Sequence, residues 1–284
     1  MIVIDKQTGG RFGNKVFHYN TLLQLSNLLG QEIFCANWDG SDIFEDIRSS
    51  DHGSLLHAGY EEIPPYNLIN LTLEELKERY SEGNFKLSSL SLTGPFFRIT
   101  KRDPRDFLKV KRHLKFPEAE VVVGIHIRGG DTRGSDGKQC KEIHPPEYYI
   151  NAIQFVKEQY KDIAETKKLL FCLCTDDPDP NYQSFQKTFN HLVDTRTSIY
   201  FEKNNSYDKD FSILTDSDIL IAGSSTFVTA AGMIGKNKKI IHSKEFVEQF
   251  KENDPEWYSS FGNGMFFHDM NHIQSDYYNV WKLI

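Results

Sequence analysis

Apolar runs of strand length alternate with helical patterns through the second half of the chain. The runs at Val121–Ile127, Leu169–Thr175, Ile219–Ala222 and Lys239–His242 are typical of buried parallel strands, because both faces of such a sheet are covered. Between them we expect helices over residues 144–160, 182–189, 210–214 and 228–234, and a weak strand at 191–193. This alternation predicts βαβ units and a parallel sheet covered by helices.

The first half opens with a βαβ unit of its own. Short apolar stretches at Ile2–Ile4 and Glu32–Ala36 predict two strands, and Asn14–Leu29 carries a broad apolar face at helical spacing. The first residue of that segment suits an N-cap, and Gly30 suits the position after the last turn. The turn at Gly9–Gly13 lacks the full Gly-x-Gly-x-x-Gly spacing, so we do not assign a dinucleotide-binding fingerprint.

The rest of the first half is less regular. Residues 37–70 are rich in loops. A helix is expected over Thr72–Tyr80, because Thr72 and Glu75 have the spacing of a capping box. A further strand is expected within Gly94–Thr100.

Length and composition suit a two-domain α/β protein. The 284 residues are enough for two ordinary domains, and a hydrophobic content of 39% can build a sizeable core. The segment Pro117–Glu120 separates the two patterns described above. We therefore expect domains at residues 1–117 and 118–265, followed by a segment 266–284 that packs back on the first domain.

Charge and cysteine content narrow the class of protein. A net charge of −7 argues against a nucleic-acid partner. No N-terminal segment joins a basic region to the apolar run of a signal peptide, and no stretch has the apolar length of a transmembrane helix. We therefore expect a soluble, cytoplasmic protein. Of the four cysteines, Cys172 and Cys174 alternate within one apolar run, a spacing that disfavours a zinc site or a disulfide scaffold.

The strongest chemical signal lies at the end of the run Val121–Ile127. It is followed at once by Arg128, two glycines and Asp131. Ligands of open α/β sheets bind outside the carboxyl ends of the strands, and a guanidinium matches a phosphate with two parallel hydrogen bonds. A surface loop with an Arg–Asp pair is the simpler interpretation, but Arg128 follows a buried run too closely to be merely solvated.

Three stretches resemble the α1,2-fucosyltransferase family and related inverting glycosyltransferases, in the same order along the chain. Gly10–Tyr19, with the sequence GRFGNKVFHY, is similar to the family's Gly-x-x-Gly-Asn-Gln-x-Phe-x-Tyr opening. His126–Asp131, HIRGGD, resembles the family's His-x-Arg-Arg-Gly-Asp peptide, and Asp210–Phe227 resembles its final Asp…Ser-Thr-Phe block. Two departures stand out: Gly129 replaces the second arginine, and Val228 begins the pair that replaces the usual two tryptophans.

The resemblance implies a fold and a reaction. The implied fold is α/β of the GT-B type, with two Rossmann-like domains facing a central cleft and the donor bound mainly by the second domain. The implied reaction is sugar transfer with inversion and without a required metal or other cofactor. Because the family's arginine pair holds the sugar nucleotide, the glycine at 129 bears on which donor is used.

The resemblance and the strand ends together select the candidate site residues. The expected catalytic residues are Arg128, Asp131, Asp136 and Asp39. The expected donor-binding residues are Gly10, Gly13, Asn14, His126, Arg128, Asp176, Ser224, Ser225, Thr226 and Phe227. Acceptor contacts are expected around Gly9–Asn14 and Trp38–Asp42.

Simpler structural roles stay open for several of these side chains. The serines before Thr226 also suit a helix N-cap, and His126 also suits a buried, hydrogen-bonded histidine. A metal-dependent enzyme would instead use paired aspartates, for which Asp177-Pro-Asp179 and Asp216-Ser-Asp218 are the available patterns.

These observations predict a glycosyltransferase that binds a nucleotide-sugar donor and a glycan acceptor. GDP-fucose is the favoured donor on resemblance, and another sugar nucleotide such as UDP-xylose is the alternative. A non-catalytic nucleotide- or carbohydrate-binding protein of the same fold is a second alternative. A phosphoryl-transfer enzyme is disfavoured, because the Gly-x-x-x-x-Gly-Lys-Ser/Thr loop is absent.

Overall fold

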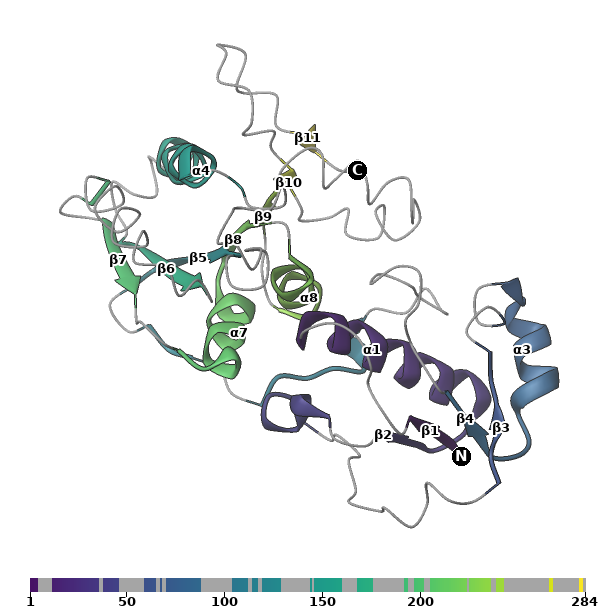
Figure 1. Ribbon diagram of the computed structural model, residues 1–284. Helices are drawn as coiled ribbons and strands as arrows, with labels where there is room; N and C mark the ends of the chain where they lie inside the picture. Colours follow the sequence, from purple (N-terminus) through teal and green to yellow (C-terminus); the bar gives the residue numbers. More distant parts are fainter. Residues whose placement is uncertain are drawn as a thin grey trace, which may run out of the picture. The chain divides into compact units, whose positions relative to one another are not determined.

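The computed structural model divides the chain into two compact units, which we call unit 1 (Met1–Lys111) and unit 2 (Arg112–Ile284). Both contain a parallel β-sheet with helices (Figure 1). The structure describes residues 1–4, 12–35, 38–45, 59–64, 67, 70–87, 104–111, 114–116, 119–128, 144, 146–159, 168–175, 192–193, 197–201, 205–223, 225–235, 239–242, 266–267 and 281–282. Each unit is considered separately below.

Unit 2 is built on a five-stranded sheet in the order β7-β6-β5-β8-β9, and every neighbouring pair is parallel. The strands are β5 (Val121–Ile127), β6 (Leu169–Thr175), β7 (Thr197–Phe201), β8 (Ile219–Ala222) and β9 (Lys239–Ile241). The chain runs outward from β5 to β7 on one side and then returns to β8 and β9 on the other. The order of the strands therefore reverses between β5 and β8, and this is the switch point at which α/β sheets bind ligands.

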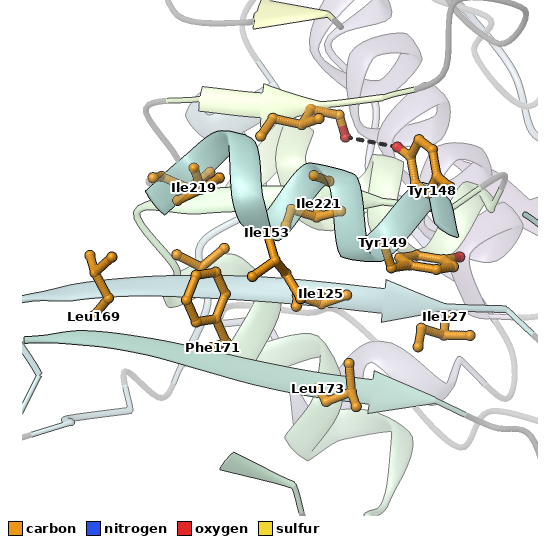
Figure 2. Close-up of a cluster of buried hydrophobic side chains, with 14 residues drawn as sticks. Ile125, Ile127, Tyr148, Tyr149, Ile153, Leu169, Phe171, Leu173, Ile219 and Ile221 are labelled. Carbon is orange, nitrogen blue, oxygen red and sulfur yellow. Dashed lines mark hydrogen bonds between the residues drawn. The ribbon is translucent and has the colours of Figure 1, made fainter. Parts of the chain in front are cut away.

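Helices cover both faces of this sheet. They are α4 (Pro146–Gln159), α7 (Tyr207–Asp216) and α8 (Thr226–Ile234), with α4 on one face and α7 and α8 on the other (Figure 1). Side chains alternate along β5, so Ile125 and Ile127 join the apolar cluster beneath α4 (Figure 2). Gly124 faces α7 instead, where a Cβ would stand 2.5 Å from the Ser217 Oγ.

Most of the elements expected in this half are confirmed. The four long apolar runs are strands, and the helices begin or end within a few residues of the expected positions. The strand expected at 191–193 is wrong, because Leu192 and Val193 lie outside any strand. The strand that does form, β7, is at the sheet edge, where the exposed Ser198 and the half-buried Tyr200 interrupt its apolar pattern. The helix expected at 182–189 lies outside the described residues.

Unit 1 contains a four-stranded sheet in the order β2-β1-β4-β3, again entirely parallel. Its elements are β1 (Ile2–Ile4), α1 (Phe12–Leu29), β2 (Ile33–Cys35), the 3-10 helix η1 (Asp39–Asp42), β3 (Glu61–Glu62), α3 (Leu73–Tyr80), β4 (Phe85–Lys86) and the 3-10 helix η3 (Pro104–Asp106). The two parallel sheets confirm the predicted α/β class. Near the C-terminus, β10 (Phe266–Phe267) pairs antiparallel with β11 (Trp281–Lys282) and contacts β9.

Of the local sequence signals in unit 1, two predicted helix boundaries are confirmed and one is wrong. The capping box is confirmed, because the Thr72 hydroxyl accepts a hydrogen bond from the Glu75 amide at 3.2 Å while the Glu75 carboxylate accepts one from the Thr72 amide at 2.7 Å. Gly30 has a φ of 65° directly after α1, as its predicted stop requires. Asn14 is not the N-cap: α1 begins at Phe12, so Asn14 lies in the first turn. The strand expected within Gly94–Thr100 lies outside the described residues.

Trp38 is a core residue of unit 1. Its ring stacks on Tyr19 with centroids 3.7 Å apart and lies parallel to Phe44 at 5.5 Å, and the side chain is 3% exposed. Gly40 covers the ring closely, since a Cβ there would stand 2.4 Å from it. An indole enclosed in this way has no open face for a sugar, which argues against the expected acceptor contact.

We expect Trp38→Ala to lower the free energy of unfolding by about 3–5 kcal/mol, the usual cost of deleting a buried aromatic side chain. Denaturant unfolding of the purified protein measures this cost. Leu73→Ala is the control in the same unit, because Leu73 is 39% exposed and should change the stability by only about 0.5 kcal/mol. A Trp38→Ala protein as stable as the control would show that Trp38 is free to serve as a ligand contact.

Candidate functional site

The carboxyl ends of β5 and β8 meet at the switch point of unit 2. The Gly223 amide, directly after β8, donates a hydrogen bond to the His126 carbonyl of β5 at 3.1 Å. The contact needs glycine, because a Cβ at Gly223 would stand 2.8 Å from that carbonyl oxygen and 3.7 Å from the Arg128 amide nitrogen. The half-buried Arg128 and the loop before α8 therefore leave the sheet at the same place.

The N-terminus of α8 follows Gly223 at this edge. Ser225 is its N-cap, and the Ser225 hydroxyl accepts a hydrogen bond from the Phe227 amide at 3.2 Å. The first turn carries no acidic side chain, so the positive end of the helix dipole is not neutralised there. The expected strand–turn–helix arrangement is confirmed, but α8 begins at Thr226, so Thr226 and Phe227 lie in its first turn rather than before it.

His126 is buried on the α7 and α8 face of the sheet. The side chain is 6% exposed, and its ring lies 5.4 Å from that of Phe227, which packs in turn on Phe211 at 5.2 Å. Its burial agrees with the interpretation of His126 as a buried structural histidine. Its position one residue before the end of β5 also places it next to the expected donor site. Both roles that the sequence left open therefore stay compatible with its position.

Two further histidines are buried in unit 2. The His144 and His242 rings lie 6.4 Å apart. Burial lowers the pKa of His144 to about 4, and burial together with the charges of His144 and His126 lowers the pKa of His242. Both imidazoles are therefore neutral near pH 7.

Asp210 is a buried carboxylate that sequence reasoning did not select as a site residue. It lies in the first turn of α7, is 9% exposed, and accepts a hydrogen bond from the Asn205 side-chain amide at 2.9 Å. Burial raises its pKa to about 6. The Cys174 thiol donates to the Asp210 backbone carbonyl at 3.9 Å, and Cys174 pairs with His126 in the sheet, which places Asp210 near the same edge.

A sequence signal for Asp210 was present. Asp210 precedes Leu214 by one helical turn and adjoins Phe211, so an acidic residue stands on the apolar face of a helix. Raised carboxylate pKa values are common at functional sites, although structural carboxylates show them as well. Asp210 also begins the third stretch that resembles the fucosyltransferase family.

The paired aspartates at 216 and 218 have structural roles. The Asp216 carboxylate accepts a hydrogen bond from the Leu114 amide at 2.5 Å, and the Asp218 carboxylate accepts one from the Val122 amide at 3.0 Å. Asp218 stands at the amino end of β8, the opposite end from Arg128. Within the described residues, no group of three or more His, Cys, Asp or Glu side chains could hold a metal ion.

The structure describes only part of the expected site. Gly13 and Asn14 lie in the first turn of α1 in unit 1, and the Asn14 Oδ1 is buried without a hydrogen-bond partner among the described residues. Asp39 begins η1. The expected site residues that lie outside the described part of the chain are Gly10, Asp131, Asp136, Asp176 and Ser224. The alternative metal pair Asp177 and Asp179 lies outside it as well.

Comparison with known proteins gives matches among solved structures. No protein-family model matches the chain, and a search of curated proteins gives no match. POFUT1 in complex with GDP-fucose matches in two crystal forms with TM-scores of 0.52 and 0.51, at 11% identity and over 83% of this chain and 95% of that chain. A variant of Arabidopsis thaliana FUT1 in complex with GDP has a TM-score of 0.49 at 11% identity, over 84% of this chain and 68% of that chain.

The fold is therefore that of fucosyltransferase-like GT-B structures, as the sequence resemblance predicted. It combines mixed α/β architecture with parallel sheets. Among the helices that the structure describes, none has the length and hydrophobicity to cross a bilayer.

The raised pKa of Asp210 predicts a specific pH dependence of stability. Because its pKa in the folded protein, about 6, lies above the ordinary value of 3.8, the folded state binds the proton more tightly. The contribution of Asp210 to stability is therefore fully present below about pH 4 and is lost as the pH rises through 6. We expect Asp210→Asn to gain about 2–3 kcal/mol relative to the unmodified protein between pH 4 and pH 7.

Urea unfolding at several pH values between 4 and 7 measures this difference. Two stability curves that stay parallel across the range would show that the Asp210 carboxylate is not desolvated.

Proposed function

We propose that this protein is a glycosyltransferase that moves a sugar from a nucleotide-sugar donor to a glycan hydroxyl, with GDP-fucose as the favoured donor. The observation that carries the proposal is the meeting of Arg128 and the N-terminus of α8 at the switch point of a parallel sheet. The likeness of the fold to POFUT1 in complex with GDP-fucose supports it.

The phosphate chemistry suits these two groups. When a sugar leaves a nucleotide sugar, negative charge grows on the departing diphosphate and must be stabilised in the transition state. The Arg128 guanidinium and the positive end of the α8 dipole can supply that stabilisation. We therefore propose a reaction that requires no divalent metal and proceeds with inversion by direct displacement.

Asp210 suits the recognition of a guanine base. Guanine presents two neighbouring N–H donors, on N1 and N2, and a carboxylate accepts two hydrogen bonds side by side. Uracil presents a single N–H between two carbonyl groups, which would face the carboxylate unfavourably. A site that is built to accept two hydrogen bonds rejects a ligand that lacks one of them, so Asp210 favours GDP over UDP.

The acceptor hydroxyl needs a general base. Asp39, Asp42, Asp131 and Asp136 are our candidates, because they follow the second strand of unit 1 or the arginine of unit 2 in the sequence. Replacing these carboxylates also separates the two alternatives, because an enzyme would lose activity and a non-catalytic binding protein of the same fold has none to lose.

We expect GDP to bind at least about tenfold more tightly than UDP or CDP in buffer that contains EDTA. Arg128→Ala should weaken GDP binding by about 2–4 kcal/mol, the scale for losing a charged, partly buried contact. A thermal-shift screen ranks the nucleotides, because a bound ligand raises the melting temperature, and calorimetry gives the affinities. Preference for UDP would favour a donor such as UDP-xylose, and an unchanged affinity in Arg128→Ala would remove Arg128 from the site.

Transfer to a glycan acceptor should continue in excess EDTA. Replacing the one of the four candidate carboxylates that acts as the base by Asn should lower kcat by about 10²–10⁴-fold. Initial-rate kinetics with the donor chosen by the binding screen measure both effects. Loss of activity in EDTA with recovery on adding Mn²⁺ would make Asp177 and Asp179 the leading metal ligands. Nucleotide binding with no turnover on any glycan acceptor would favour the non-catalytic alternative.

A further inference from the structure

Two adjacent tyrosines at the start of α4 contact the peptide that joins β8 to the loop before α8. The Tyr148 hydroxyl donates a hydrogen bond to the Ala222 carbonyl at 2.8 Å and lies 3.5 Å from the Ile241 carbonyl. Tyr149 lies over the end of β5 near Ile127 (Figure 2). Its hydroxyl reaches Gly223, where a Cβ would stand 2.8 Å from it.

The peptide between Ala222 and Gly223 is therefore held on both sides. Its carbonyl accepts from Tyr148 of α4, and its amide donates to the His126 carbonyl of β5. The space beside the Gly223 Cα is filled by the Tyr149 hydroxyl. The elements α4, β5 and β8 thus meet at Gly223, close to the proposed phosphate contacts at Arg128 and the N-terminus of α8.

Both hydroxyls stay protonated at physiological pH. Burial raises the pKa of Tyr148 and of Tyr149, and each side chain is 1% exposed. A phenylalanine would fill the same apolar core without the cost of burying a hydroxyl. Apolar packing by itself therefore does not account for tyrosine at these two positions.

We propose that Tyr148 and Tyr149 are positioning residues for the nucleotide site, and that they set the spacing between Arg128 and the N-terminus of α8. This inference rests on the proposed function. Neither tyrosine touches the donor in this proposal; both act through the Ala222–Gly223 peptide. Their loss should therefore weaken contacts with the phosphates and leave recognition of the base nearly unchanged.

The test compares Tyr148→Phe, Tyr149→Phe and the double variant with Tyr80→Phe. Tyr80 is a matched control in unit 1, because its buried hydroxyl accepts a hydrogen bond from Asn67 at 2.6 Å. We expect each unit 2 variant to weaken GDP binding by about tenfold and guanosine binding by less than about twofold. Tyr80→Phe should leave both affinities unchanged, measured below the melting temperature of every variant.

A pair of glycine substitutions tests the same spacing from the other side. Gly223→Ala should weaken GDP binding, whereas Gly232→Ala should not. The Cβ of the latter would meet the Ile240 side chain at 2.4 Å, so Gly232→Ala is the control for crowding that is remote from the loop. Equal losses of affinity in the two variants would overturn the proposal.

Amide hydrogen exchange separates failure of the inference from failure of the proposed function. Exchange at Gly223 should be at least about tenfold faster in Tyr148→Phe and Tyr149→Phe. The Asp218 amide, which donates to the Val122 carbonyl at 2.8 Å at the other end of the same strands, should be unaffected.

Unchanged exchange at Gly223 would overturn the positioning role whether or not GDP binds. Faster exchange in a protein that binds no nucleoside diphosphate would support the structural role of the tyrosines and refute the proposed function. Faster exchange with unchanged GDP affinity would overturn the inference and leave the proposed function standing.

Discussion

The close approach of β5 and β8 at their carboxyl ends is the constraint on which the candidate site depends. One backbone hydrogen bond, from the Gly223 amide to the His126 carbonyl, joins the two strand ends, and only glycine leaves enough room for it. Because the strand order reverses between these strands, Arg128 after β5 and Gly223 after β8 lie at the switch point of the sheet. Arg128 and the N-terminus of α8 are brought together by this geometry.

Burial then determines which polar groups at this edge carry charge. His144 and His242 are neutral near pH 7, because desolvation opposes their protonation. Burial raises the pKa of the Asp210 carboxyl group, and the hydrogen bond from Asn205 opposes part of this rise. In the proposed site, the opposite charges of Arg128 and Asp210 suit a ligand that has anionic phosphates at one end and N–H donors at the other.

Tertiary contacts also give structural roles to residues that the sequence had offered for chemistry. Trp38 is enclosed by other side chains, and the carboxylates of Asp216 and Asp218 accept backbone hydrogen bonds at the opposite end of the sheet from Arg128. In each case the residue type suited a functional role. The structural role of each residue comes from its neighbours, which belong to parts of the chain distant in sequence, such as Leu114 for Asp216.

Local sequence alone determined most of the elements. Continuous apolar runs predicted β5, β6, β8 and β9, and the capping box at Thr72 predicted the start of α3. Both signals act over a few residues, so they can be recognised without the tertiary structure. The short strand β4 and the edge strand β7 escaped prediction, because pairing with neighbours rather than apolar pattern defines them. Arg128 and Ser225 were selected from the sequence because each follows closely after a predicted strand. The sequence places Asp210 on the apolar face of a helix, but only the tertiary structure shows the burial that raises its pKa.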